Sequence, residues 1–285
     1  MAIVCRSALS LAAMCCLAAP VCAQSGAERA VTDIGAAQNT LKELQRLGAE
    51  IKAHQENATT GIVSTQLDDQ TPPMPIPKDP HVVVLFSGKP EELRANWVRQ
   101  GSDQPPTWQV KDGAMVTSGS SIVTKRNFKD FQLHVEFKVP YMPEAHGQER
   151  GNSGVGLLVT YEIQVLDSYG FKDPGSGDCG AVYSQSGPLV NACKPPLIWQ
   201  TYDISFHAAR FGADGKVVQK PRVTVFQNGL CVQNNQEING GTGIGGKADV
   251  KEGPIYLQFH NNTVQFRNVW IVPLPEEGAK HYAPR

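Results

Sequence analysis

The chain of 285 residues can form one large domain or two small ones, and its apolar fraction of 41% can build a sizeable core. Its formal net charge of −1, without a long basic run, argues against a nucleic-acid partner, because a phosphate-binding surface usually shows as a basic patch. The 27 Gly and 20 Pro residues favour many short strands joined by turns.

Residues 1–23 are expected to be a cleavable signal peptide. Arg6 supplies a positive charge, an apolar run from Ala8 to Ala19 follows, and Val21-Cys22-Ala23 fits a cleavage site after Ala23. This run is too short to span a membrane, and no other stretch could do so. A lipoprotein interpretation would acylate Cys22, but the preceding residues match that signal poorly. We therefore expect a periplasmic or secreted protein.

Export changes how the cysteines are interpreted. The mature chain would keep Cys179, Cys193 and Cys231, and an oxidising compartment favours one disulfide with one leftover thiol. Cys179 and Cys193 form the natural pair, since they flank a Gly-, Ser- and Pro-rich loop. Closing a loop of about 15 residues contributes roughly 3 kcal/mol. Cys231 lies in an apolar run and is expected in the core, and the spacings match no structural zinc pattern.

Residues 24–57 read as a helix, because apolar residues recur at three, four and seven positions. Such a helix could dock on the main domain or pair with a copy of itself as a short coiled coil, which would make the protein self-associate. Residues 58–80 lack periodicity and carry five prolines from Pro72 to Pro80, which indicates a linker or a surface strap. We place the domain boundary near His81, with the domain over 81–275 and a tail over 276–285.

From His81 to Leu274 the sequence pattern is typical of β structure. The expected elements, in chain order, are strands at 81–86, 108–110, 114–117, 121–124, 131–139, 199–208, 222–227, 230–233, 255–260 and 264–272, with a short helical turn at 91–97. Asn228-Gly229 is a strong signal for a type I′ hairpin turn. About a dozen short strands with almost no helix predict a two-sheet sandwich.

One further stretch, GNSGVGLLVTYEIQVLDS from Gly151 to Ser168, is read as a single strand that follows a turn. Side chains alternate along a strand, so Glu162 and Gln164 share a face. Asp167 would point the other way unless a bulge after Gln164 turned it onto the same face. The spacing leaves two interpretations open, a strand that lines a cleft and a half-exposed strand with a wet face.

Polar residues also share faces on other expected strands: His134 with Glu136, Asp203 with His207, and Gln258 with His260. If these strands belong to one sheet, the side chains form one surface. Carboxylates and amides bind sugar hydroxyls, and aromatic rings such as Tyr183 and Trp199 pack on the apolar face of a pyranose. We therefore expect a carbohydrate ligand. For any single residue a structural role stays open as the alternative to ligand binding: Trp199 could lie in the core, and Arg267 could be an ordinary surface residue.

Three separated segments give the sequence a recognisable pattern. They are GNSGVGLLVTYEIQVLDSYG, then CGAVYSQSGPLVNACKPP followed by WQTYDISFHAARF, and finally GPIYLQFHNNTVQFRNVWIVPL. Together they resemble the bacterial 3-keto-disaccharide hydrolase domain family, formerly a domain of unknown function, over about Val82 to Leu274. The resemblance implies an all-β, concanavalin A-like jelly roll of two antiparallel sheets with a concave carbohydrate face.

The resemblance also bears on mechanism. Glycosidases of that wider fold carry a strand motif Glu-x-Asp-x-x-Glu, and this chain has Glu162, Gln164 and Asp167 at that spacing. Direct displacement by two glutamates is therefore not supported. The family name implies another route: a carbonyl at C3 acidifies the C2 proton, a base removes it, the C1 substituent leaves and water adds.

Such a site needs a base, a donor for the enolate oxygen and an acid for the leaving oxygen. Our candidates for proton transfer are Glu136, Glu162, Asp167 and His260. Our candidates for substrate binding are Asn152, Gln164, Tyr183, Asn191, Trp199, His207, Gln258 and Arg267.

The chain departs from the usual family pattern at Thr160, Phe259, Asn261 and Gln265, where Arg, Asp, Gly and Arg are usual. These departures keep an alternative open, a lectin-like module that binds a glycan without turnover. No cofactor is expected, although Glu, Asp and His on one face would also suit a divalent metal. The enzyme interpretation requires the four proton-transfer candidates to lie within about 10 Å on one sheet, because acid and base must reach one sugar.

Overall fold

A computed structural model of the chain describes residues 69 and 71–275. The chain divides into two units, residues 1–64 and 65–285, and the described residues all belong to the second. The expected signal peptide, the helix over 24–57, most of the linker and the tail lie outside the described residues. Within the described ranges, no helix has the length and hydropathy that a membrane-spanning helix needs.

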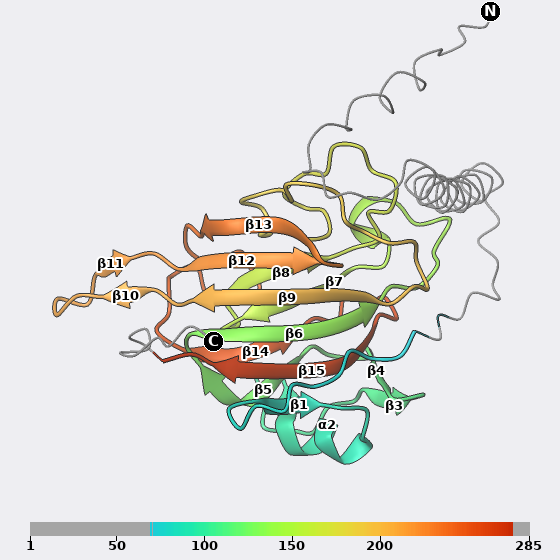
Figure 1. The fold of residues 1–285 in the computed structure, drawn as a ribbon, viewed down its shortest axis with the longest axis horizontal. Coiled ribbons are helices and arrows are strands. Elements are labelled where there is room, and N and C mark those ends of the chain that lie inside the picture. Colours follow the sequence, from blue (N-terminus) through green and yellow to red (C-terminus); the bar gives the residue numbers. More distant parts are fainter. Residues whose placement is uncertain (1–68, 70, 276–285) are drawn as a thin grey trace, which may run out of the picture. The chain divides into compact units, whose positions relative to one another are not determined.

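Two antiparallel sheets make up the described domain (Figure 1). The larger, eight-stranded sheet has the order β13-β12-β9-β6-β15-β4-β3, with β1 also paired to β15. Its strands are β1 (Val83–Phe86), β3 (Gln109–Lys111), β4 (Ala114–Val116), β6 (Phe131–Lys138), β9 (Gln200–His207), β12 (Arg222–Gln227), β13 (Leu230–Glu237) and β15 (Gln265–Pro273). The five-stranded sheet has the order β2-β5-β14-β7-β8. Its strands are β2 (Trp97–Arg99), β5 (Ile122–Phe128), β7 (Ser153–Leu157), β8 (Tyr161–Val165) and β14 (Gly253–Leu257).

A short helix, a 3₁₀ turn and a two-stranded ribbon complete the domain. Helix α2 (Pro90–Asn96) begins at a proline, which suits the first turn because its missing N–H has no partner there. A 3₁₀ turn, η1, covers Gly147–Glu149. Strands β10 (Arg210–Phe211) and β11 (Val217–Gln219) pair only with each other and extend beyond the sandwich in Figure 1.

The core lies between the two sheets and follows from strand alternation. In β6, Phe131, Leu133, Val135 and Phe137 belong to the buried apolar cluster, so the residues between them face out of the sandwich. In the five-stranded sheet, Ile163 and Leu257 are fully buried in the same cluster. The expected all-β, two-sheet antiparallel jelly-roll sandwich is thus confirmed.

The stretch Gly151–Ser168 differs from its expected form. It is a hairpin, because β7 pairs with β8 from Ser153↔Val165 to Leu157↔Tyr161. The turn lies at Leu158 and Val159, both with positive φ (57° and 51°). This turn could not be expected from the residue types, because bulky and β-branched residues seldom adopt positive φ. The β7–β8 pairing ends at Ser153↔Val165, and beyond it Asp167 donates its backbone N–H to the Arg150 carbonyl at 3.1 Å, one residue out of that register. The chain is therefore irregular where the bulge was expected.

The hairpin at Asn228-Gly229 forms as expected. Gln227 pairs with Leu230, and both turn residues have positive φ (52° and 81°), which a type I′ turn requires. The described part of the Pro-rich segment behaves as a strap rather than a free linker. Arg267 of β15 donates a hydrogen bond to the Thr71 carbonyl at 2.7 Å, and Asn268 donates one to the Met74 carbonyl at 2.9 Å.

The expected Cys179–Cys193 disulfide is not formed in this structure, and both residues are buried free thiols. The two thiols hydrogen-bond each other, and each sulfur has a further partner: Cys179 Sγ lies 3.2 Å from the Tyr202 hydroxyl, and Cys193 Sγ lies 3.6 Å from the Leu166 carbonyl oxygen. Cys231, expected in the core, is only partly buried on β13.

Candidate functional site

The outer face of the five-stranded sheet carries a continuous row of side chains. Strand pairing aligns Val98 of β2 with Val123, Val123 with Tyr256, Tyr256 with Gly156, and Gly156 with Glu162 of β8. Residues opposite each other in an antiparallel ladder point to the same face. Beyond β8, the loop residue Tyr183 donates its backbone N–H to the Glu162 carbonyl and so extends this row.

Two glycines of β7 make room on this face for larger side chains from both neighbouring strands. A Cβ at Gly154 would lie 2.0 Å from Glu162 Oε1, and one at Gly156 would lie 2.7 Å from Tyr256 Cδ1. Such distances are far inside van der Waals contact. The carboxyl of Glu162 and the ring of Tyr256 therefore converge over β7 because β7 has no side chains there.

Glu162 is a buried carboxyl group without a charged partner. The residue is 3% exposed, and within the described ranges no group lies at hydrogen-bonding distance from its carboxylate. Burial in a poorly solvated site disfavours the charged form and raises the pKa of Glu162 to about 8. At neutral pH this carboxyl is mostly protonated, and at a pH about one unit higher half of it is a carboxylate that can accept a proton.

Amide side chains surround Glu162 on one side. Gln164 Nε2 donates to Asn152 Oδ1 and to Gln148 Oε1, both at 3.2 Å. Asn152 in turn donates to the Gln148 carbonyl at 2.6 Å, and Gln148 Nε2 donates to the Gly177 carbonyl at 2.7 Å. This chain of amides fixes the Gln164 side chain and leaves its carbonyl oxygen to accept hydrogen from a ligand hydroxyl.

A glycine-rich loop, residues 239–249, lies over the same face. Thr242 Oγ1 accepts the Glu162 backbone N–H at 2.8 Å, and the Ile244 carbonyl accepts from Gln100 Nε2 at 3.3 Å. Ile244 Cδ1 would lie 2.5 Å from a Cβ at Gly156, so Ile244 packs beside Tyr256. This loop accounts for the low exposure of Glu162 and Tyr256, at 3% and 4%.

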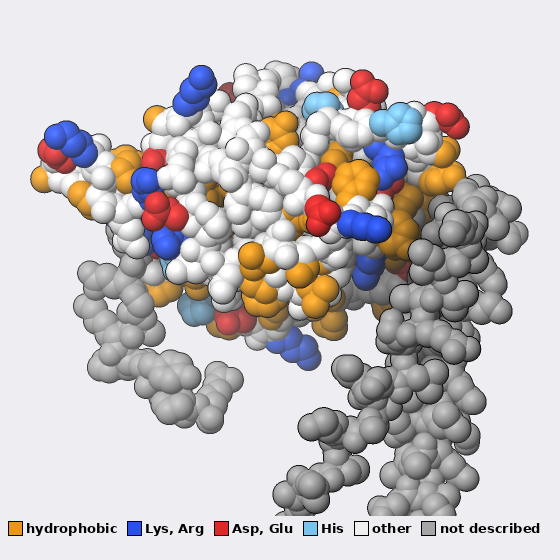
Figure 2. Space-filling model, turned by 90° about the horizontal axis from the view of Figure 1, so that it is seen from above, with side chains coloured by type: hydrophobic (Ala, Val, Ile, Leu, Met, Phe, Trp, Pro, Cys, Tyr) orange, Lys and Arg blue, Asp and Glu red, His pale blue; other side chains and the backbone are white. Residues whose placement is uncertain are grey.

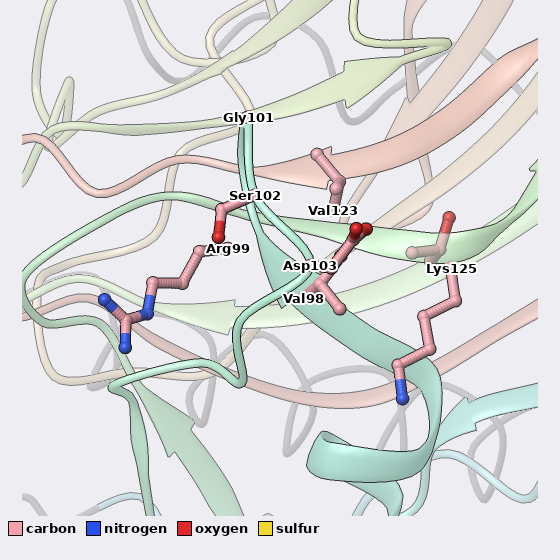
Figure 3. Close-up of a pocket in the computed structure, with 8 residues that line it drawn as sticks. Val98, Arg99, Gly101, Ser102, Asp103, Val123 and Lys125 are labelled. Atoms are coloured by element: carbon pink, nitrogen blue, oxygen red, sulfur yellow. The ribbon is translucent and has the colours of Figure 1, made fainter.

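A cavity of about 620 Å³ opens farther along this face, next to β2 and β5. Val98 and Val123 of the cross-strand row contribute to its lining. Figure 3 shows Arg99 and Lys125 on opposite sides of it, with the Asp103 carboxylate between them. None of the residues singled out from the sequence lines this cavity, but it lies at the far end of the row that holds Glu162.

The outer face of the eight-stranded sheet holds a second buried glutamate, Glu136, with a full set of partners. Arg267 Nε donates to Glu136 Oε2 at 2.6 Å, while Asn268 Nδ2 and the Met74 backbone N–H donate to Oε1 at 2.8 and 2.7 Å. His134 Nε2 lies 3.6 Å from Oε1. The strap residue Met74 is thus part of this network.

The electrostatics of Glu136 are the reverse of those of Glu162. Burial alone would raise its pKa, but hydrogen bonds from His134, Asn268, Met74 and Arg267 outweigh burial and lower the pKa of Glu136 to about 2. His134 also bonds Asp203 at 2.7 Å, and although burial opposes the charged imidazolium, its two acidic partners raise the pKa of His134. Glu136 is therefore a fixed anion in an ion-pair network.

The sequence prediction that Glu136 and Arg267 share a site with Glu162 is wrong, so the requirement that all four proton-transfer candidates lie on one sheet is not met. An acid–base site on this domain has to be built from Glu162 and groups outside that set of four. β6 and β15 belong to the eight-stranded sheet, and their polar residues leave the sandwich on the side opposite to Glu162. Alternation along each strand was read correctly, but sequence alone does not assign strands to sheets. His207 is exposed at the last position of β9, in the same eight-stranded sheet, and Trp199 directly precedes the first residue of that strand.

The ring of Trp199 is largely buried and contacts two cations. The Arg267 guanidinium lies 4.0 Å and the Lys138 ammonium 4.9 Å from its ring centroid. Its backbone N–H donates to Asp69 Oδ2 at 2.7 Å. A cavity of about 370 Å³ beside it is lined by Lys111 and other strap and strand residues, and it belongs to this second face.

Asp167 and Asn191 have structural partners. Asp167 lies past the end of β8, its Oδ2 is 3.3 Å from Arg150 Nε, and burial raises its pKa although Arg150 opposes this effect. Asn191 Nδ2 donates to the Ser168 and Phe171 carbonyls, both at 2.8 Å. These contacts hold the loop between β8 and β9 in place and leave neither side chain free for a sugar.

Four sequence-predicted residues do gather with Glu162, namely Asn152, Gln164, Tyr183 and Gln258. Gln258 is half-buried just after β14, and its backbone N–H donates to the Gly154 carbonyl at 3.0 Å. His260 is exposed in the following loop.

Tyr256, Ser121 and Gln148 also belong to the site but were not predicted from the sequence. Tyr256 could have been, because it lies two residues before Gln258 in an expected strand and so shares its face.

Charged side chains do not gather into one patch on the face shown in Figure 2, where Lys and Arg lie beside Asp and Glu. Within residues 69 and 71–275, no group of three or more His, Cys, Asp or Glu side chains is placed to hold a metal ion. The carboxyl and amide side chains gathered around Glu162 form the candidate site.

Comparisons with known proteins agree with a carbohydrate-active domain. Residues 81–272 match the family described as the 3-keto-alpha-glucoside-1,2-lyase-like domain. A crystal structure of a candidate glycosyl hydrolase from Parabacteroides distasonis is 34% identical, with a TM-score of 0.63, and the match covers 75% of this chain and 98% of that one. A second candidate glycosyl hydrolase from that organism, 22% identical with a TM-score of 0.51, shares the fold over 68% of this chain and 94% of its own. No curated protein sequence matches this chain. The chain belongs to the 3-keto-alpha-glucoside-1,2-lyase-like domain family.

Proposed function

We propose that this protein cleaves the glycosidic bond of 3-keto-glycosides, with Glu162 as the base. The observation that carries the proposal is the isolated, buried carboxyl of Glu162 with its pKa of about 8, flanked by amides on an outer sheet face. A general base works best when its pKa lies near the working pH. An ordinary strand carboxylate, solvated or ion-paired, would not have this property.

The reaction follows from the chemistry of a 3-keto sugar. The Glu162 carboxylate takes the C2 proton, and the C–H electrons form a C2=C3 double bond with negative charge on the C3 oxygen. When the C3 carbonyl re-forms, a C1=C2 double bond appears and the C1 oxygen leaves with a proton. Water then adds its hydroxyl to C1 and gives its other proton to the group that protonated the leaving oxygen, while Glu162 returns its proton to C2, which completes hydrolysis. If release precedes this addition, the product is the unsaturated sugar of a lyase.

The neighbouring amides suit the remaining tasks. Gln258 is half-buried beside Gly154 and can donate to the enolate oxygen at C3. Gln164, fixed by Asn152 and Gln148, can accept from a ring hydroxyl. Tyr183 follows Glu162 in the cross-strand row, so its side chain can contact the sugar at that end of the row.

A direct test incubates the full-length protein with a 3-keto-glucoside and follows release of the aglycone. We expect release by the wild-type protein, and loss of at least about 10²-fold in the Glu162→Gln variant, which keeps the shape but removes the base. Equal rates in the two proteins would exclude Glu162 as the base. Saturable binding of oxidised or ordinary glycans without any turnover would favour a lectin-like module instead.

We also propose where the protein acts and that its reaction needs no metal ion. The sequence of residues 1–23 favours export to the periplasm or the outside, and N-terminal sequencing of the mature protein should begin at Gln24.

The steps above need only acids and bases, so dialysis against a chelator should leave turnover unchanged. Activity that falls with the chelator and returns with a divalent ion would require a metal in the mechanism.

A further inference from the structure

We propose that Tyr256 is the acid that protonates the leaving oxygen of the glycoside. This inference rests on the proposed function of Glu162. It starts from the position of the phenol, which the sequence argument did not single out. Tyr256 and Glu162 lie in the same cross-strand row, separated only by Gly156 of β7.

The absence of a side chain at Gly156 is what brings the two groups toward each other. The Tyr256 ring occupies the space that a Cβ at Gly156 would need, at 2.7 Å from Cδ1 and 2.8 Å from Cβ of the tyrosine. The Glu162 carboxyl occupies the corresponding space over Gly154. Acid and base thus lie on either side of a strand that presents only backbone between them.

The hydroxyl end of Tyr256 is held on the side away from Glu162. It hydrogen-bonds Ser121 Oγ at 3.0 Å, and Ser121 Oγ also accepts the Phe259 backbone N–H at 3.0 Å. Burial and the charge of Glu162 raise the pKa of Tyr256, whereas its bonds to Ser121 and Gln258 oppose the rise. The phenol is therefore protonated at the working pH, and the same two neighbours stabilise the phenolate that proton transfer leaves behind.

The position along the face matches the place of the scissile bond. Tyr256 lies between Glu162 and the cavity of about 620 Å³ that begins at Val123. A keto-sugar ring bound beside Glu162 would direct its C1 substituent toward this cavity. When the C1–O bond breaks, its electron pair stays on the departing oxygen, which takes the Tyr256 proton. The phenolate then regains a proton from the water that adds at C1.

The test compares two leaving groups in wild-type protein and in Tyr256→Phe, which keeps the ring over Gly156 and removes the hydroxyl. A 3-keto-glucoside of methanol needs an acid, whereas one of 4-nitrophenol leaves readily as an anion. We expect Tyr256→Phe to slow methanol release about 10²–10⁴-fold and nitrophenol release less than about 10-fold. Tyr169→Phe, an exposed tyrosine, should change neither rate and serves as the control.

A second readout separates this role from a structural one and from the base. Exchange of the C2 proton with D₂O requires Glu162 but no leaving-group acid, so Tyr256→Phe should retain it within a few-fold while Glu162→Gln loses it. Equal slowing of both leaving groups, or loss of exchange in Tyr256→Phe, would contradict the role of Tyr256. Absence of both release and exchange in the wild-type protein would refute the proposed function itself.

Discussion

The two outer faces of this sandwich each hold a buried glutamate, and they use it in opposite ways. Glu136 on the eight-stranded sheet has partners for both oxygens and a pKa of about 2, while Glu162 on the five-stranded sheet has a pKa of about 8. Both are nearly inaccessible, at 2% and 3% exposed. Burial raises the pKa of both carboxyls, so the partners make the difference.

This contrast separates a structural carboxylate from a reactive one. Hydrogen bonds from Arg267, Asn268 and the strap keep Glu136 charged at every working pH, which ties the strap to the sheet. Glu162 is left with the full desolvation cost of its charge. A group in that state gains free energy by taking up a proton, which is the property that a general base near neutral pH needs.

Exchanging each glutamate for glutamine should give the largest difference between the faces. Glu162→Gln should lose about 10²–10⁴-fold in turnover, about 3–5 kcal/mol of transition-state free energy, because the base is gone. Glu136→Gln should retain turnover within about 10-fold wherever the protein is folded. Steady-state rates on a 3-keto-glucoside check this, and a reversed ranking would place the site on the other sheet.

Removing the Glu136 side chain should cost mainly stability. Glu136→Ala leaves the Arg267 guanidinium and the strap without their acceptor, and breaking a buried ion pair costs about 3–5 kcal/mol. Urea unfolding checks the value. Glu162→Ala is the matched control on the other face, and a loss as large as that of Glu136→Ala would show that Glu162 is also structurally paired.

Glu162 should contribute to the pH dependence of stability, in addition to His134 and Asp167, whose pKa values are also raised. Its pKa rises from 4.5 in the unfolded chain to about 8 in the folded protein, so folding favours the protonated form. Its contribution is complete below pH 4.5 and is lost at about 1.4 kcal/mol per pH unit as pH rises to about 8. Denaturant unfolding between pH 5 and pH 9 should show this slope in wild-type protein and a flatter curve in Glu162→Gln. Identical slopes would mean that Glu162 is not buried as described.

The pH dependence of activity should follow the same group. The base must be deprotonated, so kcat/KM should rise about tenfold per pH unit below pH 8 and level off above it. An activity that is constant from pH 5 to 8 would imply a base with an ordinary carboxyl pKa.

Adding a methyl group at Gly154 should disturb the site more than the fold. A Cβ there would lie 2.0 Å from Glu162 Oε1, so Gly154→Ala displaces the carboxyl. We expect a loss of about 10-fold in kcat with less than about 2 kcal/mol of destabilisation. Gly175→Ala, where the φ angle is not positive and a Cβ would meet only Asp178 Oδ2 at 3.7 Å, is a control for the cost of losing a glycine. Unchanged kcat in Gly154→Ala would show that this position of Glu162 is not required.

The smallest effect is expected at the glycine-rich loop. Ile244 packs over Gly156 beside Tyr256, and Ile244→Ala should loosen this cover. KM should change about two- to fivefold with kcat nearly constant, since Ile244 holds no reacting atom. A change in kcat alone would instead place Ile244 near the reacting atoms.

Much of the fold could be predicted from sequence because it depends on local patterns. Alternation in Phe131–Lys138 and the Asn228-Gly229 turn gave two elements directly. The β7–β8 turn could not be predicted, because Leu158 and Val159 adopt positive φ without any turn residue. The pairing of Glu162 with Gln164 on one face followed from strand period, whereas separating Glu136 from them required the order of strands in two sheets.

Exchange of the C2 proton of a 3-keto-glucoside in D₂O tests the central claim most directly, because it isolates the step assigned to Glu162. Deuterium uptake at C2 can be followed by NMR for the wild-type protein, Glu162→Gln and Glu136→Gln. The account predicts uptake by wild-type protein and by folded Glu136→Gln, and none above background by Glu162→Gln. Uptake by Glu162→Gln at the wild-type rate would contradict it.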